Sequence, residues 1–243
     1  MANPFRHAIV IGGSSGIGEE LVKQLAASGY KVAAVGRNEA KLREIATPYA
    51  GTVITFKHDV REYDKVPALF QEITKQLGGL DLFIYSSGVM PDVEMDEYDF
   101  DKDRAILETN LLGAVAWLDQ AAIRFDKTGA GTIVGIGSVA GDRGRGGMPA
   151  YCTSKAALAT YLESLRNRLS TKGVKVVTIK PGPTATPMTV NSKFKNMMPA
   201  DKAAALILQK SKSGGEHYLA LPHRVIFFVL RNVPSFIFRR MRI

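Results

Sequence analysis

The feature that most constrains the fold is a regular alternation of short apolar runs and amphipathic stretches along the first 180 residues. The apolar runs are rich in Val and Ile, with little polar alternation, which is typical of strands buried on both faces of a parallel sheet. The expected strands cover residues 7–11, 31–35, 53–57, 82–85, 132–136, 174–179 and, after a longer gap, 217–221.

Helical patterns separate these runs. In one of them Val66, Phe70, Ile73 and Leu77 share a single helical stripe. The expected helices cover residues 18–28, 41–46, 66–77, 103–122, 151–169 and 200–212. Strands that alternate with helices form βαβ units. The sequence therefore predicts an α/β fold, a single Rossmann-like, doubly wound domain with a mainly parallel seven-stranded sheet and helices on both faces.

The positive charge is concentrated near the C-terminus. From Pro181 onward ten Lys and Arg face two acids, a net charge of 10 − 2 = +8, whereas the first 180 residues carry 22 − 21 = +1 of the total +9. No nucleic-acid-binding motif accompanies this charge, so we expect no nucleic-acid partner. An acidic ligand or an anionic membrane surface fits better. In the opposite sense, residues 92–103 hold seven acids and one Lys, which predicts a solvated loop that leads into a helix.

Cysteine and histidine usage excludes two further classes. Cys152 is the only cysteine, so the chain forms no intrachain disulfide and we expect a reducing, cytoplasmic location. The four histidines (His7, His58, His217 and His223) show no metal-ligand spacing and are interpreted as structural or surface residues, with no metal site. No stretch approaches the roughly 20 apolar residues needed to span a bilayer.

A glycine-rich turn follows the first strand. Gly12, Gly16 and Gly18 frame Ser14, Ser15 and Ile17 between that strand and the next helix. Gly12 permits a tight turn, a small residue at 16 lets backbone N–H groups approach a pyrophosphate, and Gly18 lets the helix pack closely on the sheet. We therefore expect residues 12–18 to bind a dinucleotide.

The end of the second strand bears on which dinucleotide is bound. Gly36 carries no carboxylate for the ribose hydroxyls of NAD, and Arg37 offers a guanidinium where the 2′-phosphate of NADP would lie. The alternative is that Arg37 is a surface residue beside a helix. NADP(H) is the expected cofactor.

Three residues suggest a proton-transfer site. Tyr151 and Lys155 are four residues apart on one expected helix, so their side chains share a face. An ammonium one turn away is expected to lower the tyrosine pKa and to suit it for proton exchange with a carbonyl or alcohol. Ser138 ends another strand, at the edge of the sheet that also holds the nucleotide, and its hydroxyl can polarise a substrate oxygen.

Together these residues resemble the short-chain dehydrogenase/reductase family, with a match that runs to about Met188. The resemblance implies a catalytic tetrad of Asn110, Ser138, Tyr151 and Lys155, in which Asn110 holds a proton-relay water and Lys155 also holds the nicotinamide ribose. It also implies cofactor contacts from Asp59 and Val60 at the adenine, from Ser87 and Gly88 after the fourth strand, and from Pro181, Gly182 and Thr186 at the nicotinamide carboxamide.

The resemblance implies a hydride-transferring oxidoreductase, expected to act as an NADP(H)-dependent ketone reductase on a small-molecule carbonyl and to form a homo-oligomer. Two alternatives stay open: a catalytically silent NADP(H)-binding redox sensor, and a membrane-recruited binding protein. Residues 1–222 are the expected catalytic domain, with a substrate-specificity segment at about 183–213.

Residues 223–243 form a basic, amphipathic tail in which two apolar clusters are surrounded by five Arg and no acid. Such a tail suits a helix in an anionic membrane interface, which would make the protein peripherally membrane-associated and favour a hydrophobic or lipid-like substrate. The alternative is a tail that packs on the domain or on a second subunit, with its Arg side chains pointing outward.

Overall fold

The expected apolar runs form the strands of one sheet in which every neighbouring pair is parallel. The computed structural model describes residues 6–192 and 194–241. Its sheet has the order β3-β2-β1-β4-β5-β6-β9, which confirms the seven-stranded, doubly wound prediction. The strands are β1 (Arg6–Ile11), β2 (Tyr30–Gly36), β3 (Val53–Lys57), β4 (Leu82–Tyr85), β5 (Gly131–Ile136), β6 (Val174–Lys180) and β9 (Gly215–Tyr218).

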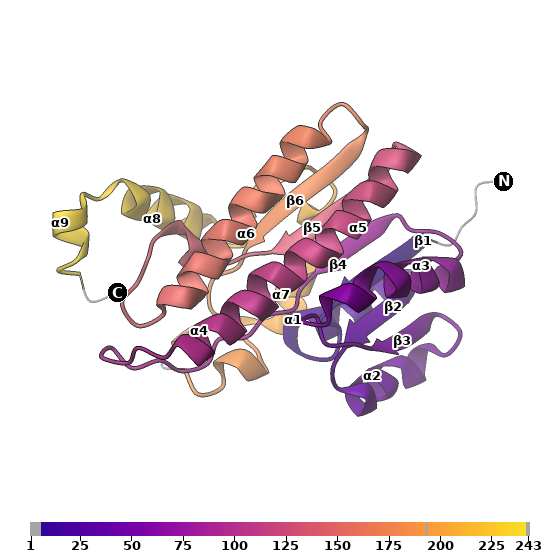
Figure 1. Ribbon diagram of the computed structural model, residues 1–243, viewed down its shortest axis with the longest axis horizontal. Coiled ribbons are helices and arrows are strands. Elements are labelled where there is room, and N and C mark those ends of the chain that lie inside the picture. The colour runs from indigo at the N-terminus through magenta and orange to yellow at the C-terminus, as the bar shows by residue number, and fades with distance from the viewer. Residues whose placement is uncertain (1–5, 193, 242–243) are drawn as a thin grey trace.

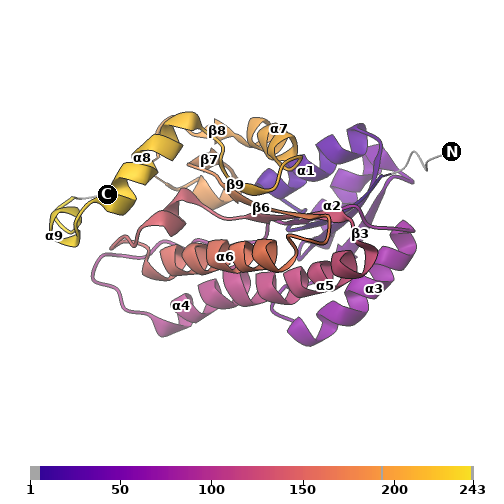
Figure 2. The ribbon, with the colours of Figure 1, turned by 90° about the horizontal axis from the view of Figure 1, so that it is seen from above.

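Helices cover both faces of the sheet (Figures 1 and 2). One face is covered by α1 (Gly16–Ala27), α2 (Glu39–Ala46) and α7 (Ala200–Lys210), and the other by α3 (Val66–Leu77), α5 (Gly113–Thr128) and α6 (Pro149–Arg168). Successive strand residues point to opposite faces. Ile9 therefore packs with Trp117 of α5 in one core, and Val10 packs with Leu21 of α1 in the other.

Most boundaries lie within two residues of the sequence prediction, and two elements differ by more. The strand expected at 217–221 is Gly215–Tyr218, because Pro222 lies in the first turn of the following helix, where a proline is favoured. The helix expected at 103–122 runs as α4 (Phe100–Leu107), a π-helical segment (Glu108–Leu112) and α5. Its start is earlier because the Asp99 side chain accepts hydrogen bonds from the backbone N–H groups of Asp101 and Lys102.

Short elements connect the main helices and strands. Within the described residues, four 3₁₀ helices cover Thr47–Tyr49, Tyr63–Lys65, Val139–Asp142 (η4) and Pro187–Thr189. Within the expected substrate segment, β7 (Thr184–Ala185) pairs with β8 (Met198–Pro199) in a small second sheet. Lys193, in the same segment, lies outside the described residues.

The C-terminal residues form α8 (Leu221–Asn232) and the single turn α9 (Ser235–Phe238). Both project from the strand-end edge, beyond the body of the domain (Figures 1 and 2). Within 6–192 and 194–241, no helix is long and apolar enough to cross a membrane. Arg242 and Ile243 of the predicted tail lie outside the described residues.

Candidate active site

A cavity of about 390 Å³ opens at the carboxyl ends of β1, β2, β4, β5 and β6. The chain crosses here from the β1–β3 half of the sheet to the β4–β6 half, which is where ligands bind in doubly wound sheets. Most of the residues selected from the sequence line this crevice: Gly12, Ser14, Ser15, Gly16, Ile17, Gly18, Arg37, Val60, Ser87, Gly88, Ser138, Tyr151, Lys155, Pro181, Gly182 and Thr186.

The glycine turn has the geometry of a phosphate-binding loop. Gly12 and Gly16 have positive φ values of 86° and 55°, which side chains disfavour. A Cβ atom on Gly18 would lie 2.0 Å from the carbonyl oxygen of Gly12, so only glycine lets α1 approach the strand this closely. Backbone N–H groups at the start of α1, together with the helix dipole, therefore face the crevice and suit an anionic ligand.

Arg37 lies exposed at the end of β2 and lines the crevice beside the glycine turn. The residue before it, Gly36, is in close contact with Ser14, because a Cβ atom at 36 would lie 2.8 Å from Ser14 Oγ. Larger side chains at 36 are therefore disfavoured, and Arg37 places a positive charge at this end of the crevice.

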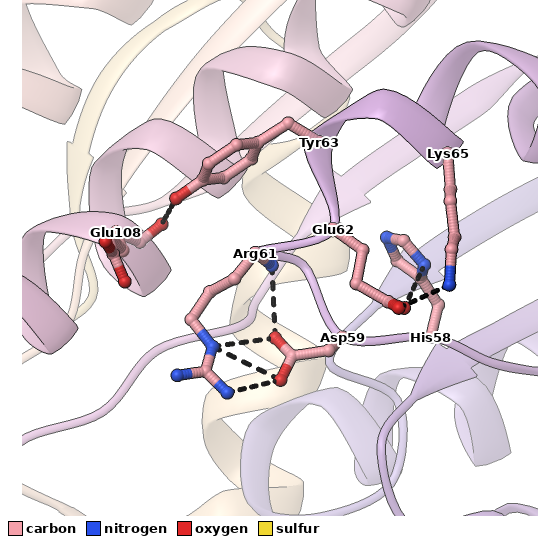
Figure 3. A network of polar contacts seen from close by, with 7 residues as sticks. All are labelled: His58, Asp59, Arg61, Glu62, Tyr63, Lys65 and Glu108. Carbon is pink, nitrogen blue, oxygen red and sulfur yellow. Dashed lines mark hydrogen bonds and ion pairs between the residues drawn. The ribbon is translucent and has the colours of Figure 1, made fainter.

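Asp59 does not line the cavity, although its neighbours His58 and Val60 do. Its carboxylate accepts hydrogen bonds from the Arg61 guanidinium, with Nη2 to Oδ2 at 2.7 Å, and from the Arg61 backbone N–H at 3.0 Å (Figure 3). These hydrogen bonds lower the Asp59 pKa to about 2. Through these hydrogen bonds the carboxylate holds this loop in place beside the crevice.

Asn110 is fully buried behind the crevice wall and does not line the cavity. It lies in the π-helical segment, and its side chain accepts from the Val89 N–H at 2.7 Å and donates to the Val89 carbonyl at 2.9 Å. A Cβ atom on the adjacent Gly88 would lie 3.4 Å from Asn110 Oδ1 and 3.5 Å from Lys155 Nζ. Asn110 therefore holds the loop after β4 close to Lys155.

Ser138 follows β5 and begins η4. Its Oγ accepts a hydrogen bond from the Ala140 N–H at 3.0 Å, and its single O–H, which interacts with Tyr151, is the donor that it can offer to a ligand instead. Gly141 of the same turn packs directly on α6, since a Cβ atom there would lie 2.7 Å from the carbonyl carbon of Lys155. This contact brings Ser138 beside the Tyr151 and Lys155 side chains.

Tyr151 and Lys155 lie one turn apart near the start of α6, and both side chains are buried. Lys155 Nζ donates to the Ile136 carbonyl at 3.1 Å and lies 5.7 Å from the centre of the Tyr151 ring. Burial lowers the pKa of Lys155 to about 8. The ammonium is thus held between the end of β5 and the tyrosine.

The electrostatics of Tyr151 differ from the sequence expectation. Burial raises its pKa above the usual value, a hydrogen bond from Ser138 opposes that rise, and Lys155 is not among the groups that shift it. The reason is that the cost of removing the phenolate from water outweighs the effect of the neighbouring charges. Tyr151 is therefore protonated at neutral pH.

Pro181, Gly182 and Thr186 follow β6. Thr186 lies against the glycine turn, since a Cβ atom on Gly16 would be 3.2 Å from Thr186 Cβ. The Thr186 backbone N–H donates to Thr189 Oγ1 at 3.1 Å. This segment closes the crevice between the glycine turn and the tyrosine.

The crevice is also lined by residues that the sequence did not assign individually: Arg145, Met148, Met188, Phe194, His223 and Phe227. His223, interpreted from the sequence as structural or surface, covers Gly182 so closely that a Cβ atom at 182 would lie 2.0 Å from its ring. The only sequence signal was the spacing of His223 and Phe227, one helical turn apart. It could not indicate which face of α8 turns toward the crevice.

A buried ionic cluster joins α8 and the turn after β5 to the sheet. The Asp142 carboxylate, which is fully buried, accepts from Lys180 Nζ at 2.6 Å and from the Tyr218 hydroxyl at 2.8 Å. Arg231 of α8 approaches the same carboxylate at 3.7 Å. The cluster therefore links η4, β6, β9 and α8, so the position of α8 is coupled to that of the turn that carries Ser138.

A doubly wound parallel sheet with a glycine-rich nucleotide loop and a Ser–Tyr–Lys group in the same crevice defines an oxidoreductase of the nucleotide-binding Rossmann class. The family model for short chain dehydrogenases matches residues 6–196. The chain belongs to the short-chain dehydrogenase family, as the resemblance of its motifs indicated.

Similar proteins agree with this assignment. An uncharacterized oxidoreductase of Myxococcus xanthus (strain DK1622) is 35% identical over 193 residues, which cover 78% of this chain and 76% of that protein. The structure of a short chain dehydrogenase/reductase family protein superposes with a TM-score of 0.79 at 25% identity and covers 88% of this chain and 94% of that one. The structure of ElxO with NADP bound shares the fold, with a TM-score of 0.82, 19% identity and coverage of 90% and 99%.

Proposed function

We propose that the protein is an NADP(H)-dependent reductase of ketones, with Tyr151 as the acid–base group. The observation that carries the proposal is that Ser138, Tyr151 and Lys155 line the same crevice as the glycine turn and Arg37. A proton donor and a dinucleotide loop in one cavity suit hydride transfer to a carbonyl.

The crevice fits the cofactor at both ends. Residues 12–18 offer backbone N–H groups to the pyrophosphate, and Arg37 offers a guanidinium to the 2′-phosphate. Val60, Ser87 and Gly88 would line the adenosine half, while Lys155, Pro181, Gly182 and Thr186 would hold the nicotinamide half. Asp59 would contribute through the backbone of its loop, because its carboxylate is bound by Arg61.

A nicotinamide held by Lys155, Pro181, Gly182 and Thr186 would supply the hydride to the carbonyl carbon, or accept it from an alcohol. In the reductive direction Tyr151 donates its phenolic proton to the carbonyl oxygen, which balances the charge left by the hydride. The Ser138 O–H donates a hydrogen bond to the same oxygen and fixes its orientation. Because its raised pKa keeps Tyr151 protonated at neutral pH, the residue is in the form needed to reduce a ketone.

Lys155 and Asn110 support this step from behind. Lys155 Nζ, 5.7 Å from the centre of the Tyr151 ring, would hold the nicotinamide ribose beside the tyrosine, and Asn110 keeps the 88–89 loop packed against Lys155. The proposed relay water of Asn110 would have to reach a side chain whose oxygen and nitrogen already bind the Val89 backbone. We therefore assign Asn110 as a positioning residue.

The crevice has several large apolar side chains besides the residues assigned to the cofactor. Met148, Met188, Phe194 and Phe227 line it together with the polar Arg145 and His223, which favours a carbonyl substrate with a large apolar part. The segment 183–213 contributes two of these residues, in line with its proposed role in specificity.

The test is NADPH oxidation with a panel of ketones of increasing chain length, by the wild-type protein and Tyr151→Phe. We expect Tyr151→Phe to lower kcat by about 10²- to 10⁴-fold, because the proton donor is lost while the ring and its packing remain. NADPH binding, measured by fluorescence, should stay within a few-fold of wild type. Tyr98→Phe, at an exposed tyrosine away from the crevice, is the matched control and should keep full activity.

A different result would favour the redox-sensor alternative. Tight NADPH binding without turnover of any carbonyl in the panel, or equal activity of wild type and Tyr151→Phe, would contradict the proposed reductase.

A further inference from the structure

Helix α8 carries apolar side chains on two opposite faces. His223, Phe227 and Leu230 recur at spacings of four and three residues and turn toward the domain. Phe227 is only 7% exposed and lines the crevice. Helices that are apolar all round are normally covered on every side. Only one side of α8 is covered here.

Two arginines hold the side of α8 that turns toward the domain, which we call the inner face. Arg143 donates to the Arg231 carbonyl at 2.9 Å, and its guanidinium lies 4.5 Å from the centre of the Phe238 ring of α9. Arg145 lies 5.6 Å from the centre of the Phe227 ring. Together with the ion pair of Arg231 and Asp142, these contacts give α8 and α9 a defined orientation on the crevice wall.

The opposite face is exposed. Leu221 (74%), Val225 (61%), Phe228 (70%) and Val229 (55%) recur at helical spacing along α8. Phe236 (58%) and Ile237 (45%) of the next helix, α9, are exposed as well. We define the outer face as these six residues. Monomeric proteins rarely leave such an apolar helix face in water, which points to a binding partner.

The charge around the outer face identifies the partner. Arg224, Arg239 and Arg240 are exposed beside it, and the sequence contains no acid after Glu216. In Figure 1 the acidic segment before α4 lies apart from α8 and α9. Apolar side chains flanked by Arg alone match the interface of an anionic bilayer, where the chains enter the acyl region and Arg binds the headgroups.

We propose that the outer face of α8 and α9 docks the protein on an anionic lipid bilayer. A second copy of the chain is a poorer occupant, because a symmetric contact between two outer faces would bring Arg against Arg with no acid to pair with.

The docked orientation has a consequence for substrate access. Phe227 and the outer face belong to the same helix, so a docked bilayer lies next to the part of the crevice that Phe227 lines. An amphiphilic carbonyl compound could then pass from the lipid into the crevice without crossing water. This substrate class rests on the proposed reductase function, whereas the docking itself does not.

The test is flotation of the full-length protein with phosphatidylcholine vesicles, with and without phosphatidylglycerol. We expect binding to the anionic vesicles, weaker binding to the neutral ones, and a decrease at high salt. Phe228→Asp should lower the affinity for anionic vesicles by about tenfold or more, because an apolar anchor becomes an anion. Ile123→Asp, a similarly exposed apolar position on α5, is the matched control and should bind like wild type.

Three outcomes would overturn the docking proposal: no binding to anionic vesicles, equal loss in Phe228→Asp and Ile123→Asp, or a wild-type dimer that Phe228→Asp dissociates without any vesicle binding. Circular dichroism of each variant verifies that it is folded.

NADPH oxidation separates this proposal from the reductase function. With a short, water-soluble ketone, Phe228→Asp should match wild type. With a long-chain ketone embedded in anionic vesicles, its rate should fall along with its binding. Vesicle binding without any turnover would support docking and contradict the reductase, and turnover without binding would do the reverse.

Discussion

Lys155 serves the proposed activity, but its buried charge lowers the free energy of unfolding of the protein. Its amine is buried, and burial lowers its pKa to about 8 from the usual 10.5. Below pH 8 the folded protein must hold a buried ammonium, whereas the unfolded chain holds it in water. Stability should therefore be reduced below pH 8 and recover as the pH rises from 8 toward 10.5, because the folded state releases its proton first.

We predict that Lys155→Met abolishes reductase activity yet raises the free energy of unfolding of the cofactor-free protein by roughly 2 kcal/mol at pH 7. The gain should shrink toward pH 10, where the wild-type amine is neutral. Urea denaturation of both proteins at the two pH values measures this difference. A variant that is less stable than wild type at pH 7 would show that the hydrogen bond to Ile136 outweighs the cost of the buried charge.

Arg37 is also expected to act as a single residue, through its one charge on one phosphate. We predict that Arg37→Ala raises the Kd of NADPH by about 10- to 100-fold, the value of a charge-assisted hydrogen bond, and leaves the Kd of NADH nearly unchanged. Fluorescence titration of both cofactors gives the comparison. Lys41→Ala removes an exposed positive charge from the adjacent helix α2. It controls for a nonspecific effect of charge on cofactor binding. Equal effects of Arg37→Ala on the two cofactors would contradict a role at the 2′-phosphate.

At the scale of elements, the junction of β1 and α1 depends on contact between backbones. We predict that Gly18→Ala weakens NADPH binding by at least about tenfold and destabilises the fold by about 1–3 kcal/mol, because its Cβ would lie 2.0 Å from the Gly12 carbonyl oxygen. Gly29→Ala is the matched control. Its φ is +82° but nothing lies within 4 Å, so it should cost only about 1 kcal/mol and leave NADPH binding intact.

Thermal unfolding and NADPH titration of the two alanine variants distinguish strain at the loop from the general cost of replacing a glycine. If both variants bound NADPH like wild type, the close approach of α1 would not be what forms the cofactor site.

The element scale also explains what the sequence could and could not predict. The sheet could be predicted because buried parallel strands need continuous apolar runs. Helix α3 was predicted at its observed bounds because Val66–Leu77 keeps one apolar stripe, with a proline in its first turn and Gly78 directly after its end. The pairing of Tyr151 and Lys155 could be predicted because one helical turn places them together. The contact of His223 with Gly182 joins residues far apart in the chain, and α8 has two equally apolar faces, so no local pattern could predict it.

The roles of Asp59 and Asn110 were hard to predict for a related reason. Their side-chain types fit the expected cofactor and relay roles, but each is held by a neighbour that local patterns do not reveal: Arg61 in one case and the Val89 backbone in the other. A hydrogen-bond partner decides what a polar side chain does, and that partner is known only once the loops are placed.

For the whole molecule, the catalytic sheet and the C-terminal helices are separable in their contribution to stability. All seven strands of the main sheet end by Tyr218, and the ones that form the crevice are ordered by two extensive cores. Beyond Ala220, Phe227 is the only large apolar side chain that is buried in the described part of the chain. Residues 221–243 should therefore add little to the free energy of unfolding.

We predict that a chain ending at Ala220 folds with nearly the wild-type far-ultraviolet spectrum and loses only a few degrees in Tm, because it loses roughly one buried aromatic side chain and the Arg231–Asp142 ion pair. NADPH binding should be retained, since the glycine turn and Arg37 are remote from α8. The KM for long-chain ketones should rise much more than that for short ones, because Phe227 no longer lines the crevice. A uniform rise for every chain length would instead mean that α8 acts by positioning Ser138 through Asp142, and Asp142→Asn in the full-length protein should then reproduce it.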